Sequence, residues 1–187
     1  MTTDRYLEGQ LLLAMPNMED TRFDRSVIYI CSHTKDGAMG LVVNEVMPEI
    51  SFAELLDQLD IDVSGEVADT TVFRGGPVEA GRGFVLHSAD YVQETTLIVS
   101  ETLALTATVD ILRAMADGNG PQHSLLALGY AGWGAGQIEE EIKNNSWLTV
   151  RADDEVIFYT EPEDKWPRAM AMLGIDLSML SNDAGRA

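Results

Sequence analysis

Apolar and polar residues follow one another along the chain with two different periods, and this pattern predicts a mixture of strands and helices. Short apolar or alternating runs predict strands over residues 10–15, 26–32, 39–43, 71–74, 83–87, 96–100, 124–130, 147–151 and 155–159. The polar turn HTKDG joins the second and third of these runs and predicts a hairpin. A second hairpin is expected from the last two runs.

Helices are expected where apolar residues recur every three or four positions. Ser51 stands three residues before Glu54 in SFAELLDQL, which is the capping-box arrangement of a helix start. A longer helix is expected over residues 103–116, closed by the glycine and proline residues of DGNGP. The same period predicts helices over residues 137–144 and 165–173.

Strands and helices mix irregularly along the 187 residues instead of alternating. No internal repeat, low-complexity segment or linker-like stretch divides them. This order is typical of an α+β fold with a mixed, largely antiparallel sheet. We therefore expect one domain over residues 1–187, in which residues 181–187 form a frayed polar tail.

The charge balance narrows the classes of partner. The chain carries 12 basic and 31 acidic residues, a formal net charge of −19, and no basic residue occurs between Lys35 and Arg74 or between Arg82 and Arg113. Proteins that bind duplex DNA draw most of their affinity from Lys and Arg on phosphates, and anionic membranes attract the same residues. We therefore expect no direct nucleic-acid binding and no membrane binding, and we attribute the acidity to solubility.

Cysteine usage and hydropathy point to the cytoplasm. Cys31 is the only cysteine, so the chain forms no internal disulfide and no cysteine-based metal cluster, and we expect no metal or cofactor. Within VIYIC it is expected to pack as a small buried apolar group. No apolar run approaches the roughly 20 residues of a membrane span. The start MTTDRYLEGQ lacks a basic region followed by an apolar one, so we expect no export signal.

The segment LLALGYAGWGAGQIEEEI, residues 125–142, predicts a strand, a glycine-rich loop and a helix start. Phosphate-binding loops occupy this context, but their patterns need a small residue in place of Gln137 or a lysine in place of Ala135. The three glutamates that follow already complement the helix dipole and would repel a phosphate. The favoured interpretation is structural, with glycines that allow tight packing beneath Tyr130 and Trp133.

Two arginines beside glycines form the best candidate for a small-ligand or peptide-carboxylate pocket. They lie in the segments RGGP and GRG, as Arg74 and Arg82, and arginine holds carboxylate or phosphate groups bidentately. Arg22 and Arg25 could join them from a neighbouring loop. The favoured alternative is that the glycines form turns and that the arginines pair with the abundant Asp and Glu residues.

His87 ends the strand GFVLH and is followed by Ser88 and Asp90, which could orient it or be activated by it. The sequence around it lacks a nucleophile elbow, and His33 and His123 stand far from metal-ligand spacing. A histidine in this position is more often a hydrogen-bonding residue of the core or its rim. No catalytic residue is therefore assigned.

Three blocks of this sequence resemble the bacterial AlgH/YqgE family: QLLLAMPNMEDTRFDRSVIYICSHTKDGAMGLVVN, RGGPVEAGRGFVLH and LLALGYAGWGAGQIEEEI. The resemblance extends from Gln10 to about Leu180. It implies a mixed sheet, partly closed into a barrel and flanked by helices. The family carries a transcriptional-regulator label inherited from genetics, with no established biochemistry and no catalytic residue set. This chain has Thr21, Gly81 and Val109 where the family usually has proline, an acidic residue and arginine.

Together these features favour a non-catalytic cytoplasmic module of binding or regulation, which acts through a protein or small-molecule partner and influences gene expression only indirectly. One alternative is an enzyme of unknown substrate that uses Arg74, Arg82 and His87 in one cleft. Another is a direct DNA-binding regulator, which the net charge disfavours. The candidate ligand-binding residues are Arg22, Arg25, Arg74, Gly75, Gly76, Arg82, His87 and Trp133.

Overall fold

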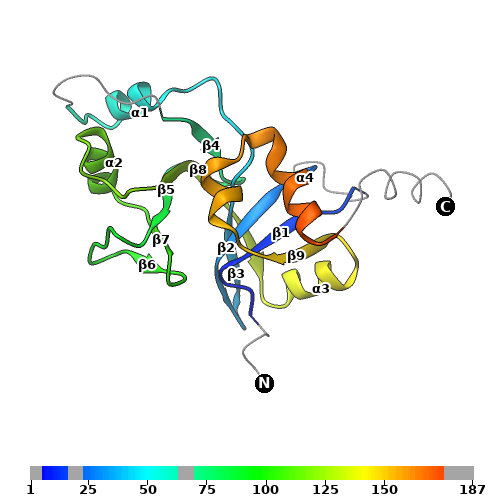
Figure 1. Ribbon diagram of the computed structural model, residues 1–187. Helices are drawn as coiled ribbons and strands as arrows, with labels where there is room; N and C mark the ends of the chain where they lie inside the picture. Colours follow the sequence, from blue (N-terminus) through cyan, green and yellow to red (C-terminus); the bar gives the residue numbers. More distant parts are fainter. Residues whose placement is uncertain (1–5, 17–22, 63–69, 175–187) are drawn as a thin grey trace. The chain divides into compact units, whose positions relative to one another are not determined.

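A computed structural model describes residues 6–16, 23–62 and 70–174 (Figure 1). The chain forms two compact units, one from Met1–Asn44 and Gly132–Ala187 and the other from Glu45–Ala131. The expectation of a single domain stays a prediction. The predicted tail, residues 181–187, and the candidate residue Arg22 lie outside the described residues.

The first unit is built on an antiparallel sheet. Its strands run in the order β9 (Trp147–Arg151), β1 (Gln10–Ala14), β2 (Val27–Thr34) and β3 (Gly37–Val42). The predicted hairpin of β2 and β3 is confirmed, with its turn at residues 35–36. Leu11, Leu12 and Leu13 are successive in β1 and all buried, so this strand is covered on both faces.

Two helices pack on this sheet. Helix α3 (Gln137–Lys143) contacts β3 and β9, and helix α4 (Pro162–Met172) contacts β1. The Trp166 indole of α4 donates to the Ala14 carbonyl at 2.9 Å, which fixes the helix to the end of β1. The aliphatic face of α4 and this hydrogen bond together explain why the late segment KWPRAMAM folds as a helix.

The expected strand at residues 155–159 is wrong. These residues form a short π-helix, η3 (Glu155–Tyr159), between β9 and α4. The apolar run VIF has no clear period, and its backbone finds partners other than a neighbouring strand. The Thr160 hydroxyl donates to the Glu155 carbonyl at 2.9 Å, and the Lys165 ammonium donates to the Ile157 carbonyl at 2.7 Å.

Lys165 is a buried ammonium that joins three segments. Its Nζ donates to the Val43 carbonyl beyond β3 and to the Ile157 carbonyl of η3, both at 2.7 Å. Burial lowers the pKa of Lys165 to about 8, and the nearby charge of Glu161 opposes that shift. Lys165 stands one helical turn before the buried Ala169, so it lies on the apolar face of α4.

The glycine-rich segment forms strand, not loop. β8 (Ser124–Gly134) continues through Gly129 and Gly132, and only residues 135–136 form a turn before α3. The amide of Gly134 donates to Gln137 Oε1 at 3.0 Å. This hydrogen bond supports the structural interpretation of the segment, because a side chain of α3 accepts from the last residue of β8.

Glu141 of α3 accepts hydrogen bonds from the indoles of two tryptophans. Its Oε1 accepts from Trp133 Nε1 at 3.1 Å and from Trp147 Nε1 at 2.9 Å, and its Oε2 accepts from Gln137 Nε2 at 2.9 Å. The two indole rings meet edge to face with their centroids 6.2 Å apart. One carboxylate therefore fixes α3 to the ends of β8 and β9.

The second unit holds a mixed sheet. Its antiparallel strands run in the order β6 (Leu97–Ile98), β7 (Leu103–Thr106), β5 (Val78–Ser88) and β8. β4 (Val72–Arg74) pairs with β8 in parallel. This parallel pair makes the sheet mixed, as the sequence predicted.

The helix expected over residues 103–116 is only half correct. Residues Leu103–Thr106 form β7, and helix α2 (Val109–Ala116) begins after Thr108. Every residue of β7 is buried, since the strand pairs with β5 on one side and with β6 on the other. A strand covered in this way has a continuous apolar sequence, which periodicity does not distinguish from a buried helix.

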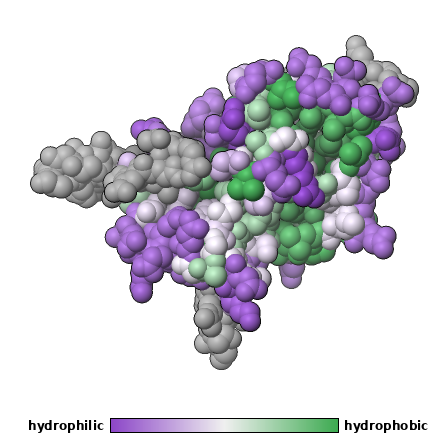
Figure 2. All heavy atoms as spheres, turned by 180° about the vertical axis from the view of Figure 1, so that it is seen from behind, coloured by the Kyte–Doolittle hydropathy of each residue, from purple (hydrophilic) through white to green (hydrophobic). Residues whose placement is uncertain are grey.

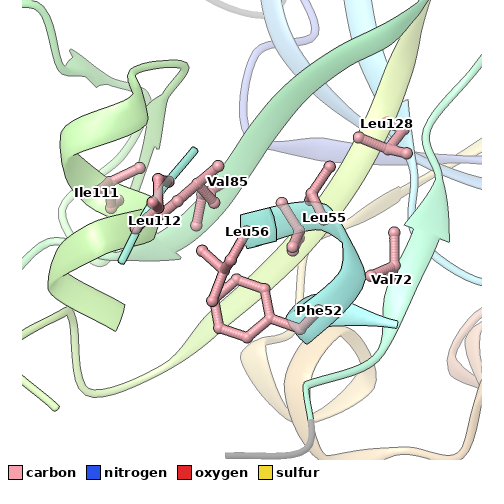
Figure 3. Packing of buried hydrophobic residues seen from close by; sticks show 10 residues of the cluster. Phe52, Leu55, Leu56, Val72, Val85, Ile111, Leu112 and Leu128 are labelled. Carbon is pink, nitrogen blue, oxygen red and sulfur yellow. The ribbon is translucent and has the colours of Figure 1, made fainter. Parts of the chain in front are cut away.

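Two helices cover one face of this sheet (Figure 3). Helix α1 (Phe52–Gln58) begins as predicted, with the Ser51 hydroxyl accepting from the Glu54 amide at 3.1 Å. Val72, Leu126 and Val85 lie side by side in adjacent strands of that face. The helices bury a common cluster against this row, to which they contribute Phe52, Leu55, Leu56, Ile111 and Leu112.

Gly75 and Gly76 serve the close approach of two backbone segments. The Gly75 amide donates to the Leu128 carbonyl at 2.8 Å. Gly76 has φ +155°, and a Cβ there would lie 2.1 Å from the Tyr130 carbonyl carbon. A side chain larger than hydrogen would therefore force β8 away from the segment that follows β4.

We predict that Gly76→Ala lowers the free energy of unfolding by about 3 kcal/mol, because the added methyl group overlaps rigid backbone. Gly81→Ala is the matched control, since a Cβ at Gly81 meets no atom within 4 Å. We expect it to change stability by less than about 0.5 kcal/mol. Urea denaturation of both variants measures the difference, and equal stabilities would contradict the close approach.

We predict that Glu141→Ala costs about 2 kcal/mol or more, because it leaves two buried indole N–H groups without their acceptor. Glu140 is an exposed neighbour on the same helix, and Glu140→Ala is expected to cost only about 0.3 to 0.5 kcal/mol. Urea denaturation gives the stabilities, and near-UV circular dichroism reports the packing of Trp133 and Trp147. An unchanged tryptophan spectrum in Glu141→Ala would argue against the shared acceptor.

Candidate functional site

The arginine predicted to hold a ligand at RGGP is engaged with carboxylates. Arg74 Nε lies 3.4 Å from Glu45 Oε1, and its NH2 donates to Glu49 Oε1 at 3.1 Å. All three side chains are about half exposed. This geometry agrees with the alternative interpretation that the arginine pairs with nearby acidic residues.

Arg82 and His87 lie on opposite faces of β5. The Arg82 guanidinium lies over the Phe84 ring at 5.2 Å from its centroid and pairs with Glu79 at 3.7 Å. His87 stands three residues beyond Phe84, so the strand alternation places it on the other face, where it is fully buried. The cleft that the enzyme alternative requires from Arg74, Arg82 and His87 is not formed.

The candidate residues of the first unit have partners of their own. The Arg25 guanidinium lies 5.4 Å from the ring centroid of Trp166, and the Arg25 carbonyl accepts from Asn44 Nδ2 at 2.9 Å. Trp133 is buried and donates to Glu141.

His87 instead begins a chain of hydrogen bonds, which is buried at His87 and Thr106 and partly buried at Thr96 and Gln93. Its Nδ1 lies 2.9 Å from the Ser88 carbonyl, and its Nε2 lies 2.7 Å from the Thr106 hydroxyl. The Thr106 and Thr96 hydroxyls are 2.8 Å apart, and Thr96 Oγ1 accepts from the Gln93 amide at 2.8 Å. These hydrogen bonds run from β5 through β7 to the segment that leads into β6.

The donors and acceptors at the two ends of this hydrogen-bonded chain fix the direction in which every hydroxyl donates. A carbonyl only accepts, so the proton of the neutral imidazole is on Nδ1 and Nε2 accepts from Thr106. Thr106 then accepts from Thr96, whose oxygen accepts from the Gln93 amide. A second proton on His87 would oppose this order. Burial accordingly lowers the pKa of His87, although the Ser88 carbonyl and the charge of Asp90 act in the other direction.

Ser88 and Asp90 do not form a nucleophile pair with His87, because both ring nitrogens are used elsewhere. The Ser88 hydroxyl donates to Asp90 Oδ1, and it accepts from the His123 amide at 3.0 Å. Asp90 Oδ2 accepts from the Gln122 amide at 3.0 Å. The Ser88 hydroxyl, and then the Gln122 amide, lower the pKa of Asp90. These contacts fasten the loop after β5 to the start of β8.

Exposed apolar residues stand close in sequence to the outer members of this chain of hydrogen bonds. The Thr108 hydroxyl donates to Gln93 Oε1 at 2.9 Å, so the start of α2 joins the same network. Large apolar residues lie one or two positions from its outer members in sequence, and they are exposed by between 43% and 61%. We name this group the β6 edge; it consists of Val92, Leu97, Ile98 and Val109.

Figure 2 shows one face of the chain, on which hydrophobic residues gather at the surface and hydrophilic residues border them. Singly exposed apolar residues are ordinary, whereas neighbouring ones are typical of interaction sites, and Leu97 and Ile98 are such neighbours in β6. Sequence reasoning missed the β6 edge, although Leu97, Ile98 and Val99 are adjacent apolar residues. Successive side chains of a strand point to opposite faces, so the three cannot all point inward, and this run could have predicted an exposed apolar side chain.

Other chemistry is not supported by the described residues. Burial raises the pKa of the Cys31 thiol to about 12, in agreement with its interpretation as a small buried apolar group. Among residues 6–16, 23–62 and 70–174, no group of three or more His, Cys, Asp or Glu side chains is placed to hold a metal ion. No helix within the same ranges is long and apolar enough to cross a membrane.

We predict that His87 makes stability depend on pH. The folded pKa is below the ordinary value of 6.5, so the unfolded chain binds a proton at a pH where the folded chain does not. The stabilisation by neutral His87 is present above pH 6.5 and is lost as the pH falls. His87→Gln can accept from Thr106 but does not titrate, so urea denaturation should show a smaller loss between pH 7.5 and 5. Parallel losses would contradict the buried neutral imidazole.

Comparison with known proteins identifies the relatives of the chain. A family model described as AlgH-like matches residues 11–178. A UPF0301 protein of Rhodospirillum rubrum is 54% identical over 182 residues, which cover 97% of this chain and 95% of the relative. A UPF0301 protein of Bradyrhizobium diazoefficiens is 53% identical over 190 residues, which cover 97% of this chain and 89% of the relative.

Solved structures agree with these matches. The solution structure of the AlgH protein from Pseudomonas aeruginosa has a TM-score of 0.81 and 41% identity, over 97% of this chain and 96% of that chain. A crystal structure of a Corynebacterium diphtheriae protein, with a TM-score of 0.74 and 20% identity over 94% and 91%, shares the fold. The predicted α+β class, a mixed and mostly antiparallel curled sheet with flanking helices, is confirmed. The chain therefore belongs to the AlgH-like UPF0301 family, whose function is uncharacterised.

Proposed function

We propose that this chain is a non-catalytic cytoplasmic binding module, which docks a protein partner at the β6 edge and influences gene expression only through that partner. The supporting observation is the β6 edge itself, where large apolar residues are exposed beside a partly buried chain of hydrogen bonds that orders the segment leading into β6. Ordering such residues without covering them costs stability, and a partner that buries them recovers it. A small-molecule partner is less well supported, because the two arginines predicted for it pair with carboxylates.

The side chains with reactive potential support a binding role. His87 is neutral and buried within the polar chain, Lys165 donates to two backbone carbonyls, and Cys31 is a buried thiol. A catalytic group must lie within reach of a substrate, and none of these three side chains is exposed. The enzyme alternative based on Arg74, Arg82 and His87 is therefore not supported at its histidine.

The exposed charges do not favour the DNA-binding alternative. Each of four arginines lies within 4 Å of a carboxylate, and these are Arg74, Arg82, Arg113 and Arg168. Exposed pairs of this kind are weak, but the paired carboxylates reduce the positive field that a phosphate backbone would meet. With a net charge of −19, the chain is expected to repel duplex DNA.

We predict that Ile98→Lys abolishes partner binding without unfolding the chain. Ile98 is 53% exposed, so a lysine there costs little stability but places a charge in the docking surface. The matched control is Leu59→Lys, because Leu59 is an apolar residue that follows α1, is 40% exposed and lies outside the β6 edge. Tagged chains expressed in the native cells are isolated gently, and the retained proteins are quantified by mass spectrometry.

The proposal expects at least one stoichiometric protein that the wild type and Leu59→Lys retain and that Ile98→Lys loses. Circular dichroism and urea denaturation confirm that all three chains are folded. A partner retained equally by all three would overturn the assignment of the β6 edge. A metabolite retained in place of a protein, and lost with Arg74→Ala, would favour a small-ligand module.

A further inference from the structure

The β6 edge offers backbone groups as well as apolar side chains. The Val99 amide donates to the Leu103 carbonyl of β7 at 3.1 Å. Backbone groups of alternate residues face the partner in an antiparallel pair, so those of Leu97 also face β7 and those of Ile98 point away from it. β6 is the last strand in its sheet order, and no strand among the described residues pairs with its outer side.

Side chains are exposed on both faces of this strand. Ile98 is opposite Ala104, which is opposite His87, so these three residues share one face of the sheet. Leu97 is the next residue and points to the other face. Leu97 and Ile98 are 43% and 53% exposed. A strand added beside β6 would cover Ile98 with one set of alternate side chains and Leu97 with the other.

The charge around this edge selects the partner. Residues 83–112 contain Asp90, Glu94, Glu101 and Asp110 but no lysine or arginine. Glu94 and Glu101 are exposed and stand three residues before and three residues after β6. A second copy of the chain would bring the same acidic groups to the same edge, where like charges repel. A basic segment would be attracted to both ends of the strand.

We infer that the β6 edge accepts an extended segment of a partner protein as an added strand. In this segment valine-like residues alternate with polar ones, and lysine or arginine lies near each end. The Ile98 amide and carbonyl pair with the backbone of the segment, and its basic residues lie beside Glu94 and Glu101. Main-chain hydrogen bonds supply affinity in this mode, and the flanking charges supply specificity. The inference rests on the proposed function, because it names the partner chemistry of the same site.

The test uses the full chain, labelled for NMR, and the capped peptide Lys-Thr-Val-Thr-Val-Thr-Lys. We expect saturable binding that shifts the amide signals of β6 and protects the Ile98 amide from hydrogen exchange, since that amide becomes hydrogen-bonded. Two control peptides separate the contributions. Replacing both lysines by glutamate removes the charge match, and N-methylation of the central backbone amides removes the strand pairing. Each should bind at least about tenfold more weakly.

Two variants of the chain complete the test. Ile98→Lys should weaken binding of the lysine peptide at least about tenfold, whereas Leu59→Lys should leave it unchanged. Equal binding of the N-methylated peptide would show attraction of charge alone and overturn the inference. A homodimer that Ile98→Lys dissociates, seen by sedimentation, would identify a second copy as the occupant and also overturn it.

The two proposals fail in different ways. A cellular partner that is lost with Ile98→Lys, but that binds without protecting the Ile98 amide, would leave the binding module standing and overturn strand addition. Peptide binding with Ile98 protection supports strand addition directly. If neither a cellular partner nor the peptide depends on Ile98, both proposals fall.

Discussion

The second unit depends on a buried imidazole that must stay neutral. His87 donates to the Ser88 carbonyl and accepts from Thr106, and these two contacts impose one direction on every hydroxyl that follows. The hydrogen-bonded chain ends in the segment that precedes β6 and, through Gln93, at the start of α2. Its members are satisfied by one another, which is the condition under which buried polar groups specify a structure instead of weakening it.

This network explains why the outer strand of the sheet is short yet ordered. β6 has two residues and makes few ladder hydrogen bonds of its own. The hydroxyls of Thr96 and Thr106 supply the missing attachment from within the sheet, and Gln93 supplies it from the loop. The backbone of β6, and with it the exposed Ile98 on the same face as His87, is therefore held by polar groups of the sheet. A pre-ordered edge of this kind lowers the entropic cost of binding.

The first unit uses polar groups in a similar way but for anchorage. Glu141 accepts from the indoles of Trp133 and Trp147, and Lys165 donates to carbonyls of two separate segments. Residues that suggest chemistry in the sequence thus serve structure in both units. The exposed groups include acidic side chains and the β6 edge, and the proposed binding role rests on the β6 edge.

Local patterns predicted the elements whose partners are close in sequence. The Ser51 cap and the hairpin of β2 and β3 follow from spacing and turn chemistry. Prediction failed at Glu155–Tyr159 and Leu103–Thr106, where continuous apolar residues fit either a helix or a strand. It failed again for the glycine-rich segment, because a strand tolerates glycine where another backbone approaches closely.

The sequence by itself determined the acidic charge, the single buried cysteine, the α+β class and the family, because these follow from composition, periodicity and motifs. Only the tertiary structure decided which polar residues are buried and with what partner. The Thr106 partner of His87 is 19 residues away, and the Val43 carbonyl that Lys165 binds is 122 residues away. Periodicity carries no information at such separations, so the β6 edge and the network beneath it emerge only when the strands are paired.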